Sequence, residues 1–423
     1  MSAGRGSRPL AAVAAVLGAW AAAAVLTAGS GVWAAGTQVA PKEIVIGTLY
    51  AGSGSFANSS MPEYAGLTFW VKTVDASGGV YVKAYGKKIP VVLKSYDDQS
   101  STSTATTLYG QLITSDHVNI LVADFGSVLT SVAIPIAAEH HMLLFDQTAS
   151  GISLFSPKNP YMVDTSIRTS ALWPTPLAQF LLSRHVRRVA VVYAANDFDQ
   201  SQAQTLVRLL AAGGVHPVAD TSVPTTTTDY ATLLHTLAAQ NPQAVIEFGY
   251  DNNDIAWFQN LSQSGLKFPL VFTIYPGLET ALLLKDAGPA ALAYTYTYAA
   301  PPLVAYNKVT VGLGVSAFLK EFPKVMPGGT LNFQTIAGYN TGLVIQEALA
   351  TSPSLDQLAL RHAVQALSGH MTTLEGPFQI NAAGAQVGEP MYIAQFFPTA
   401  HGVRLLPVYP ADHAQHAPVY PAP

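Results

Sequence analysis

The stretch that decides the fold class is Glu43-Ile44-Val45-Ile46-Gly47-Thr48-Leu49, which is followed by the loop Gly52-Ser53-Gly54-Ser55-Phe56. The first segment is almost continuously apolar, as strands are when helices cover both faces of a sheet. A helical pattern extends from about residue 61 to 76 and stops at Gly78-Gly79, since glycine favours positions just past a helix end. Strand, glycine-rich loop and helix in this order predict the first unit of an α/β fold with a parallel sheet.

The same alternation of strand and helix patterns occurs twice along the chain. It continues to about residue 145 and restarts at Val189-Ala190-Val191-Val192-Tyr193. Two consecutive α/β halves predict two lobes rather than one enlarged core. Further strands are expected at residues 89–96, 119–123, 142–145, 217–223, 244–248, 270–273 and 294–298. After these we expect helices at 315–322, 332–350 and 355–367, β hairpins over 378–408, and a disordered tail at 411–423 that is rich in Pro, Ala and His.

The scarcity of charge excludes nucleic acid as a partner. Charged residues make up 11% of the chain, against roughly 25% in an average soluble domain. The net charge is -4, and no basic stripe occurs that could neutralise phosphates. One hypothesis is that the protein works in acidic surroundings, where carboxylates are partly neutral. Ready unfolding at about pH 3 would contradict this hypothesis.

The residues needed for most catalytic, metal and cofactor sites are missing or badly spaced. With no cysteine, disulfides, thiolate catalysis, cysteine–zinc sites and a lipid-anchored cysteine are all excluded. The spacing Gly52-x-Gly54 is too short for a dinucleotide-binding fingerprint, and no Walker loop or G-x-S-x-G motif occurs. His140 and His141 are adjacent at a helix end and point in different directions, which makes a poor chelate. We therefore expect no enzyme, no cofactor and no metal.

The N-terminal segment 1–36 has the pattern of a secretory signal peptide. Arg5 and Arg8 precede an apolar run over residues 10–28, and small residues at 34–36 offer cleavage positions. The run is about as long as the shortest membrane-spanning helix, so an uncleaved anchor is the alternative. Either interpretation places the folded part outside the cytoplasm, in the periplasm or the extracellular space.

A series of short motifs follows in order along residues 42–408, nearly the whole chain after the signal segment. Because of these motifs and their order, the chain resembles the leucine/isoleucine/valine-binding protein family, which has the type I periplasmic binding fold. The motifs that carry the resemblance are Ile44-Val45-Ile46-Gly47, Ser53-Gly54, Val74-Asp75-Ala76-Ser77-Gly78-Gly79-Val80, Asp97-Asp98-Gln99-Ser100, Asn159-Pro160-Tyr161, Asp229-Tyr230, Gly265-Leu266-Lys267-Phe268-Pro269-Leu270, Ala337-Gly338-Tyr339-Asn340 and Glu375-Gly376-Pro377-Phe378.

The resemblance implies two Rossmann-like lobes with parallel sheets, joined by a three-strand hinge. Lobe one would comprise residues 42–165 and 298–375, and lobe two residues 166–297 and 376–410. The resemblance also implies a monomeric receptor of an ABC importer, which closes on a small molecule and presents the closed form to a membrane permease. Contacts with both lobes would drive this closure, since contacts with one lobe alone do not favour it.

The resemblance places the ligand against loops at the carboxyl ends of strands. Ser127 falls where the family holds a ligand carboxylate, next to Phe125 and Gly126 at a predicted helix start. This serine could leave free N–H groups for an anion or be a plain helix cap. Residues 146–149 fall where the family clasps the carboxylate. The further candidate contacts are Asp146, Gln147, Thr148, Ala149, Phe198, Tyr250, Tyr275, and Phe56, which would compensate for the loss of an aromatic ring at Ser59.

Several of these positions depart from the family pattern. An inward, ionised Asp146 would repel a carboxylate, so either Asp146 turns away or the ligand is not a simple amino acid. Tyr275 stands where the family has an acid that pairs with the ligand ammonium, although Glu279 is close in sequence. The second such acid would align near Ser170 or Leu172, which are uncharged. The ligand is therefore expected to be a small amino acid, an amide or an aromatic or other carboxylate. The alternative role is the ligand-sensing domain of a signalling or amide-responsive system.

Overall fold

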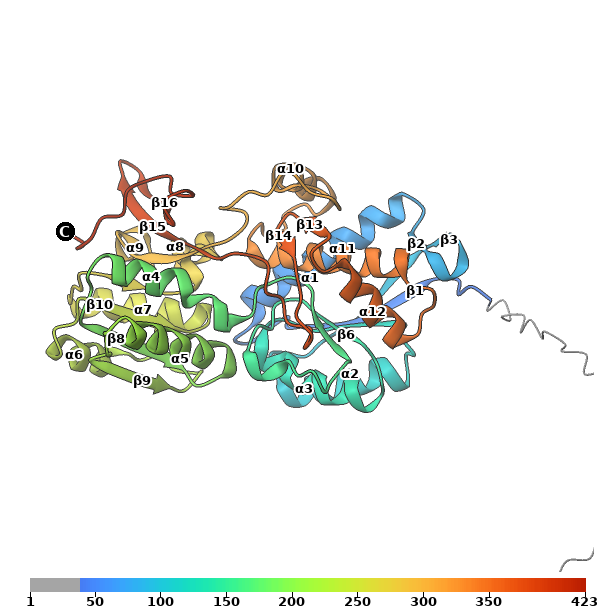
Figure 1. Ribbon diagram of the computed structural model, residues 1–423, viewed down its shortest axis with the longest axis horizontal. Helices are drawn as coiled ribbons and strands as arrows, with labels where there is room; N and C mark the ends of the chain where they lie inside the picture. Colours follow the sequence, from blue (N-terminus) through green and yellow to red (C-terminus); the bar gives the residue numbers. More distant parts are fainter. Residues whose placement is uncertain (1–38) are drawn as a thin grey trace, which may run out of the picture. The chain divides into compact units, whose positions relative to one another are not determined.

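The computed structural model describes residues 39–423, so the predicted signal peptide lies outside the described residues. Ala40–Pro423 form one compact unit around two large sheets (Figure 1). The first is a parallel sheet in the order β4-β1-β5-β6-β7. Its strands are β1 (Ile44–Tyr50), β4 (Val91–Asp97), β5 (Ile120–Val122), β6 (Leu144–Asp146) and β7 (Met162–Asp164).

Alternate residues of these strands enter two separate hydrophobic cores, because successive side chains of a strand point to opposite faces. Ile120 and Val122 enter the core shared with α1 (Ala57–Ala76), α10 (Val315–Val325), α11 (Phe333–Thr351) and α12 (Gln357–Leu367). Leu121 enters the core shared with α2 (Thr102–Thr114) and α3 (Gly126–Glu139). Helices therefore cover both faces, as the apolar run at β1 predicts. Smaller elements complete this lobe, namely β2 (Val80–Val82), β3 (Lys87–Ile89), η1 (Lys83–Tyr85), η2 (Ile152–Leu154), β13 (Met371–Thr373) and β14 (Gly376–Phe378).

The second sheet has the order β16-β15-β12-β11-β10-β8-β9. It is parallel from β9 to β12 and antiparallel through β15 and β16, so one edge departs from the all-parallel expectation. Its strands are β8 (Val189–Ala194), β9 (Ala219–Val223), β10 (Ala244–Phe248), β11 (Val271–Phe272), β12 (Tyr296–Ala299), β15 (Tyr392–Thr399) and β16 (Gly402–Tyr409). Its helices are η3 (Ser170–Leu172), α4 (Pro174–Ser183), α5 (Asp197–Ala212), α6 (Ala231–Ala239), α7 (Asp251–Ser264), η4 (Tyr275–Gly277), α8 (Thr280–Asp286) and α9 (Pro289–Leu292). We call the part built around each large sheet a lobe.

The lobe boundaries differ from those that the resemblance implies. All of β12 pairs within the second sheet, so the chain leaves this sheet after Ala299 rather than before residue 298. Conversely, β14 pairs with β13, and Phe378 and Ile380 enter the core of the first lobe. The segment at 376–380 therefore belongs to the first lobe, because the hairpin holds it there. Three segments connect the two sheets, namely those between β7 and η3, between β12 and α10, and between β14 and β15.

The C-terminal residues also differ from the expectation of disorder. The backbone N–H of Val419 donates to Gln395 Oε1 at 2.9 Å, and Tyr296 donates its hydroxyl to Val419 O at 2.7 Å. The N–H of Ala422 donates to Pro269 O at 2.8 Å. The tail is thus held against β12 and β15 by the side chains of these strands, and the prediction of disorder at 411–423 is corrected.

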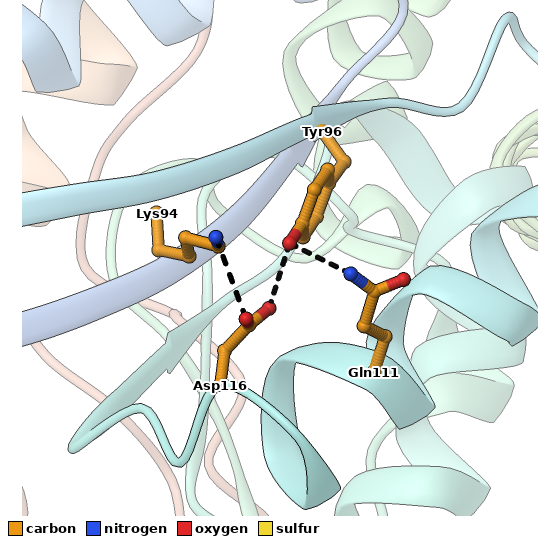
Figure 2. Close-up of polar contacts among 4 residues, drawn as sticks. All are labelled: Lys94, Tyr96, Gln111 and Asp116. Atoms are coloured by element: carbon orange, nitrogen blue, oxygen red, sulfur yellow. Dashed lines mark hydrogen bonds and ion pairs between the residues drawn. The ribbon is translucent and has the colours of Figure 1, made fainter.

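Charged contacts at the surface are sparse, and one of them ties an edge strand to its neighbouring helix. Lys94 Nζ lies 3.4 Å from Asp116 Oδ1, and Tyr96 donates its hydroxyl to Asp116 Oδ2 at 2.9 Å (Figure 2). Gln111 Nε2 of α2 donates to the same tyrosine hydroxyl at 2.7 Å. The contact fixes the edge strand β4 against α2 and the turn that follows it. Among residues 39–423, no helix combines the length and the apolar character needed to cross a bilayer.

Candidate functional site

Loops at the carboxyl ends of strands from both lobes meet around one small cavity. Phe125 and Gly126 start α3 after β5, and Thr148 follows β6. From the second lobe, Phe198 begins α5 and Tyr250 precedes α7. Parallel strands present their carboxyl ends on one side of a sheet, which explains why distant loops converge. The complete lining is Phe125, Gly126, Thr148, Ile167, Trp173, Phe198, Tyr250, Tyr275, Leu278, Phe333 and Gln334.

The cavity is aromatic, uncharged and small. Among residues 39–423, none that lines it carries a formal charge. Its volume is about 10 Å³, which is roughly the space of one water molecule. An organic ligand therefore needs the rings around the cavity to move apart before it can enter.

Tyr250 is the centre of the aromatic wall. Its ring centroid lies 5.3 Å from that of Phe56, 5.9 Å from Phe125 and 5.5 Å from Phe198. The ring of Trp173 meets Phe198 edge to face at 5.3 Å. Edge-to-face and tilted contacts of this kind stabilise aromatic clusters beyond their buried area. Phe56 thus supports the wall from behind without lining the cavity.

The N-terminus of α3 forms the polar end of the cavity. Gly126 has a φ of +74°, and a Cβ there would lie 3.2 Å from the Tyr250 hydroxyl oxygen. The N–H of Gly126 donates to Thr148 Oγ1 at 3.0 Å. Burial raises the pKa of Tyr250, while the backbone N–H groups of Val128 and Ser127, which approach its hydroxyl, lower it. A hydroxyl of the second lobe therefore faces the helix end where an anion would be stabilised.

Ser127 does not cap α3. Phe125 occupies the N-cap position, and no side chain caps this helix. Ser127 Oγ instead accepts a hydrogen bond from Gly151 N at 3.0 Å. The serine therefore fixes the neighbouring loop, and the backbone of α3, rather than this side chain, faces the cavity.

The other residues of the expected carboxylate clasp are buried behind the cavity. Asp146 turns away and accepts from Ala149 N at 3.1 Å, which caps the turn that carries Thr148. It is fully buried rather than at the surface. Gln147 Nε2 donates to Ala123 O at 2.8 Å and to Glu63 Oε1 at 2.9 Å. Of the residues 146–149, Thr148 is the one that lines the cavity.

Ser59 lies at a contact between the lobes rather than in the cavity. Its hydroxyl donates to Glu279 Oε1, and the adjacent Asn58 Nδ2 donates to Asp251 Oδ2 at 3.2 Å. Asn252 Nδ2 donates to Ser55 O at 2.5 Å. The start of α1 therefore contacts two acidic side chains of the second lobe, so Glu279 is not directed at the aromatic cavity.

Trp173, Phe333 and Gln334 line the cavity but were not among the expected contacts. Gln334 is 1% exposed, and its Oε1 has no partner within residues 39–423. The signal in the sequence was weak, because none of the three lies in a loop directly after a strand. Trp173 precedes α4, and Phe333 and Gln334 begin α11. Gln334 therefore adds an acceptor for a ligand donor to the cavity lining.

A wider groove of about 750 Å³ lies next to the contact between the lobes. The residues that line it include Asn58 of α1, Glu279 and Lys285 at the two ends of α8, and Leu405 of β16. No aromatic ring of the described chain lines this groove. Ligand pockets are usually concave, with aromatic walls and a few convergent polar groups, so the smaller cavity is the better candidate site.

Carboxyl groups are buried in unusual number within the described part of the chain. Arg361 is the only cationic side chain buried there. Burial raises the pKa of every one of these acids, and several raise one another further. They are Glu63, Asp98, Asp124, Asp146, Asp164, Asp199, Glu247, Asp251, Asp254, Glu279, Glu375 and Glu389.

Two lobes that enclose a ring-lined cavity define a receptor for a small molecule. The chain belongs to the periplasmic binding protein family, whose sequence model matches residues 43–400. A Leu/Ile/Val-binding protein homologue of Brucella melitensis is 23% identical over 345 residues, covering 79% of this chain and 83% of the relative.

Solved structures show the same fold. The branched-chain amino acid transporter substrate-binding protein LivJ of Streptococcus pneumoniae, in complex with isoleucine, has a TM-score of 0.72 at 16% identity, covering 87% of this chain and 100% of its own. An ABC-transporter solute-binding protein of R. palustris, in complex with benzoate, has a TM-score of 0.71 at 17% identity, covering 86% of this chain and 96% of its own. The family and these neighbours are solute-binding proteins rather than enzymes. Within residues 39–423, no group of three or more His, Asp or Glu side chains is placed to hold a metal ion.

Proposed function

We propose that this protein is the extracytoplasmic receptor of an ABC importer and binds a small carboxylic acid with an aromatic or apolar body. The observation that supports this ligand class most strongly is the lining of the cavity. It combines the N-terminus of α3, beside Thr148, where a carboxylate is stabilised by the positive end of the helix, with aromatic walls and no charged side chain.

An α-amino acid fits this lining less well than an acid without an ammonium group. A buried ammonium without an anionic partner is costly, because it loses its hydration. The nearest acidic candidate, Glu279, accepts from Ser59 and lines the wider groove instead. The benzoate complex of the R. palustris protein is a precedent within this fold for an aromatic acid as ligand.

The arrangement of the lining also supports a mechanism by closure. Thr148 and Gly126 belong to the first lobe, whereas Trp173, Phe198 and Tyr250 belong to the second. A ligand that contacts both sets stabilises the closed form, and a membrane permease can distinguish that form from the open one. In this proposal the 1–36 segment exports the chain, which acts as a monomer at the outer side of the cytoplasmic membrane.

A thermal-shift screen tests the proposal. The panel contains benzoate and aliphatic acids, the matching amides, amino acids, urea, sugars and metal ions. We expect carboxylates to give the largest increases in Tm, because a ligand at 100 times its Kd adds about 2.7 kcal/mol to the stability of the folded form.

The matched acid and amide pairs make the result decisive. A shift with benzoate and none with benzamide supports recognition of a carboxylate. Shifts with amino acids alone would overturn the ligand class but keep the receptor. Shifts with sugars or metal ions alone would overturn the proposed function.

A further inference from the structure

Glu63 lies directly behind Thr148, outside the cavity. Its Oε2 is 2.6 Å from Thr148 Oγ1, and its Oε1 accepts from Gln147 Nε2 at 2.9 Å. Glu63 is 1% exposed and comes from α1, whereas Thr148 follows β6. The carboxyl therefore contacts the one side chain of the expected clasp that faces the cavity.

The protonation of Glu63 decides which way the Thr148 hydroxyl can point. Thr148 Oγ1 already accepts from the Gly126 N–H at 3.0 Å. If Glu63 is ionised, it cannot donate, and Thr148 must direct its own proton to Oε2. If Glu63 is protonated, Oε2 is the oxygen that carries the proton, since Oε1 accepts from Gln147. Thr148 Oγ1 then accepts two hydrogen bonds, one from Gly126 and one from Glu63, and its own hydroxyl proton points into the cavity.

The surroundings of Glu63 favour the protonated form. Burial raises its pKa, the hydrogen bond with Thr148 lowers it, and the nearby carboxyls of Asp124, Asp146 and Glu375 raise it again. These carboxyls come from the loop after β5, from β6 and from the turn between β13 and β14. Within the described chain, no cationic group opposes them at this position.

We propose that Glu63 is a positioning residue, which donates its proton to Thr148 and thereby turns the threonine hydroxyl into a donor for the ligand carboxylate. This assignment rests on the proposed function, because it requires a carboxylate in the cavity. It predicts that carboxylate affinity is lost as the pH rises and Glu63 ionises. The loss has two causes, namely the reversal of the Thr148 hydrogen bond and the new negative charge behind it.

The Glu63→Gln variant separates this role from a structural one. A glutamine at this position can donate to Thr148 through Nε2 and accept from Gln147 through Oε1, so it imitates protonated Glu63 at every pH. Calorimetric titration with benzoate at pH 5, 6.5 and 8 gives the affinity of each protein. For the original protein we expect Kd to increase about 10- to 100-fold as Glu63 ionises, as is typical for losing a hydrogen bond to a charged group.

For Glu63→Gln we expect a Kd that stays close to the pH 5 value of the original protein. Glu247→Gln is the matched control, since Glu247 is another buried acid, does not line the cavity and is not among the carboxyls that raise the pKa of Glu63. It should keep the pH dependence of the original protein. Thr148→Val should bind weakly at every pH.

Each result has a distinct meaning. An equal loss of affinity in Glu63→Gln and the original protein would overturn the role of Glu63, and so would a Kd of Glu63→Gln that lies well above the pH 5 value of the original protein. Benzoate that binds none of the proteins at any pH would instead count against the proposed ligand class, and with it against this assignment.

Discussion

Replacing Gly338 with alanine should lower the free energy of unfolding by about 3 kcal/mol. Alanine normally stabilises a helix relative to glycine, so the expected sign is reversed here. In α11, a Cβ on Gly338 would lie 1.9 Å from Glu63 O of α1. On the other helix, a Cβ on Gly66 would lie 2.0 Å from Thr335 O. The two helices therefore touch through their backbones, and any side chain at the crossing forces them apart.

Urea denaturation followed by circular dichroism measures this effect. Gly110→Ala is the control, because Gly110 lies inside α2 and a Cβ there meets no atom within 4 Å. We expect Gly110→Ala to gain about 0.5–1 kcal/mol. Equal stability of Gly338→Ala and the original protein would show that α1 and α11 are not in contact at this point. It would also weaken the placement of Glu63, which α1 carries.

The ligand-free protein should become less stable as the pH rises from 4 to 8. The pKa is raised by burial to about 6 for Asp124, to about 7 for Asp254 and to about 8 for Asp98 and Glu375. A carboxyl group whose pKa is raised in the folded state makes its full contribution to the free energy of unfolding below its unfolded pKa. It loses this contribution as the pH rises through its folded pKa. Since one pKa unit corresponds to about 1.4 kcal/mol, the expected loss is several kcal/mol.

Glu247→Gln should remove part of this loss. Both oxygens of Glu247 and Oδ1 of Asp254 lack partners among residues 39–423, and the Asp254 charge raises the pKa of Glu247 beyond the effect of burial. A neutral amide can donate to Asp254, so we expect a gain of about 1–3 kcal/mol at pH 8 and little change at pH 4. Glu43→Gln, at an exposed position, should change stability at neither pH.

Urea denaturation of these variants at both pH values distinguishes the explanations. Greatest stability at pH 8 would contradict the raised pKa values and the hypothesis of acidic surroundings. Greatest stability near pH 4 would support that hypothesis. It would also explain why a chain with so few charges keeps so many acids in its interior.

The α/β fold could be predicted because its central strands are buried on both faces. Ile44, Ile46 and Val189–Val192 form continuous apolar runs, and a loop and a helix follow each run. Strand β14 was assigned to the wrong lobe, because its pairing with β13 is local and depends on a contact that the residue pattern does not reveal. The C-terminal tail was predicted to be disordered for a similar reason. Its order depends on Gln395 and Tyr296, which are distant in sequence.

Part of the candidate site followed from the family resemblance, together with the rule that ligands bind at the carboxyl ends of strands. Phe125, Gly126, Thr148, Phe198, Tyr250 and Tyr275 all lie in or just after the loops at these ends and line the cavity. Their chemistry was harder to predict, since neither the inward turn of Thr148 nor the outward turn of Asp146 follows from residue type. The role of Glu63 could not be predicted either, because it depends on the crossing of α1 with α11.

The most direct test of the receptor mechanism is a crystal structure of the protein with benzoate. We expect the benzoate ring between residues of both lobes, with contacts to Trp173 and Tyr250. One carboxylate oxygen should accept from the Thr148 hydroxyl, next to the N-terminus of α3. Benzoate in the wider groove beside Glu279, or in contact with one lobe alone, would contradict the account.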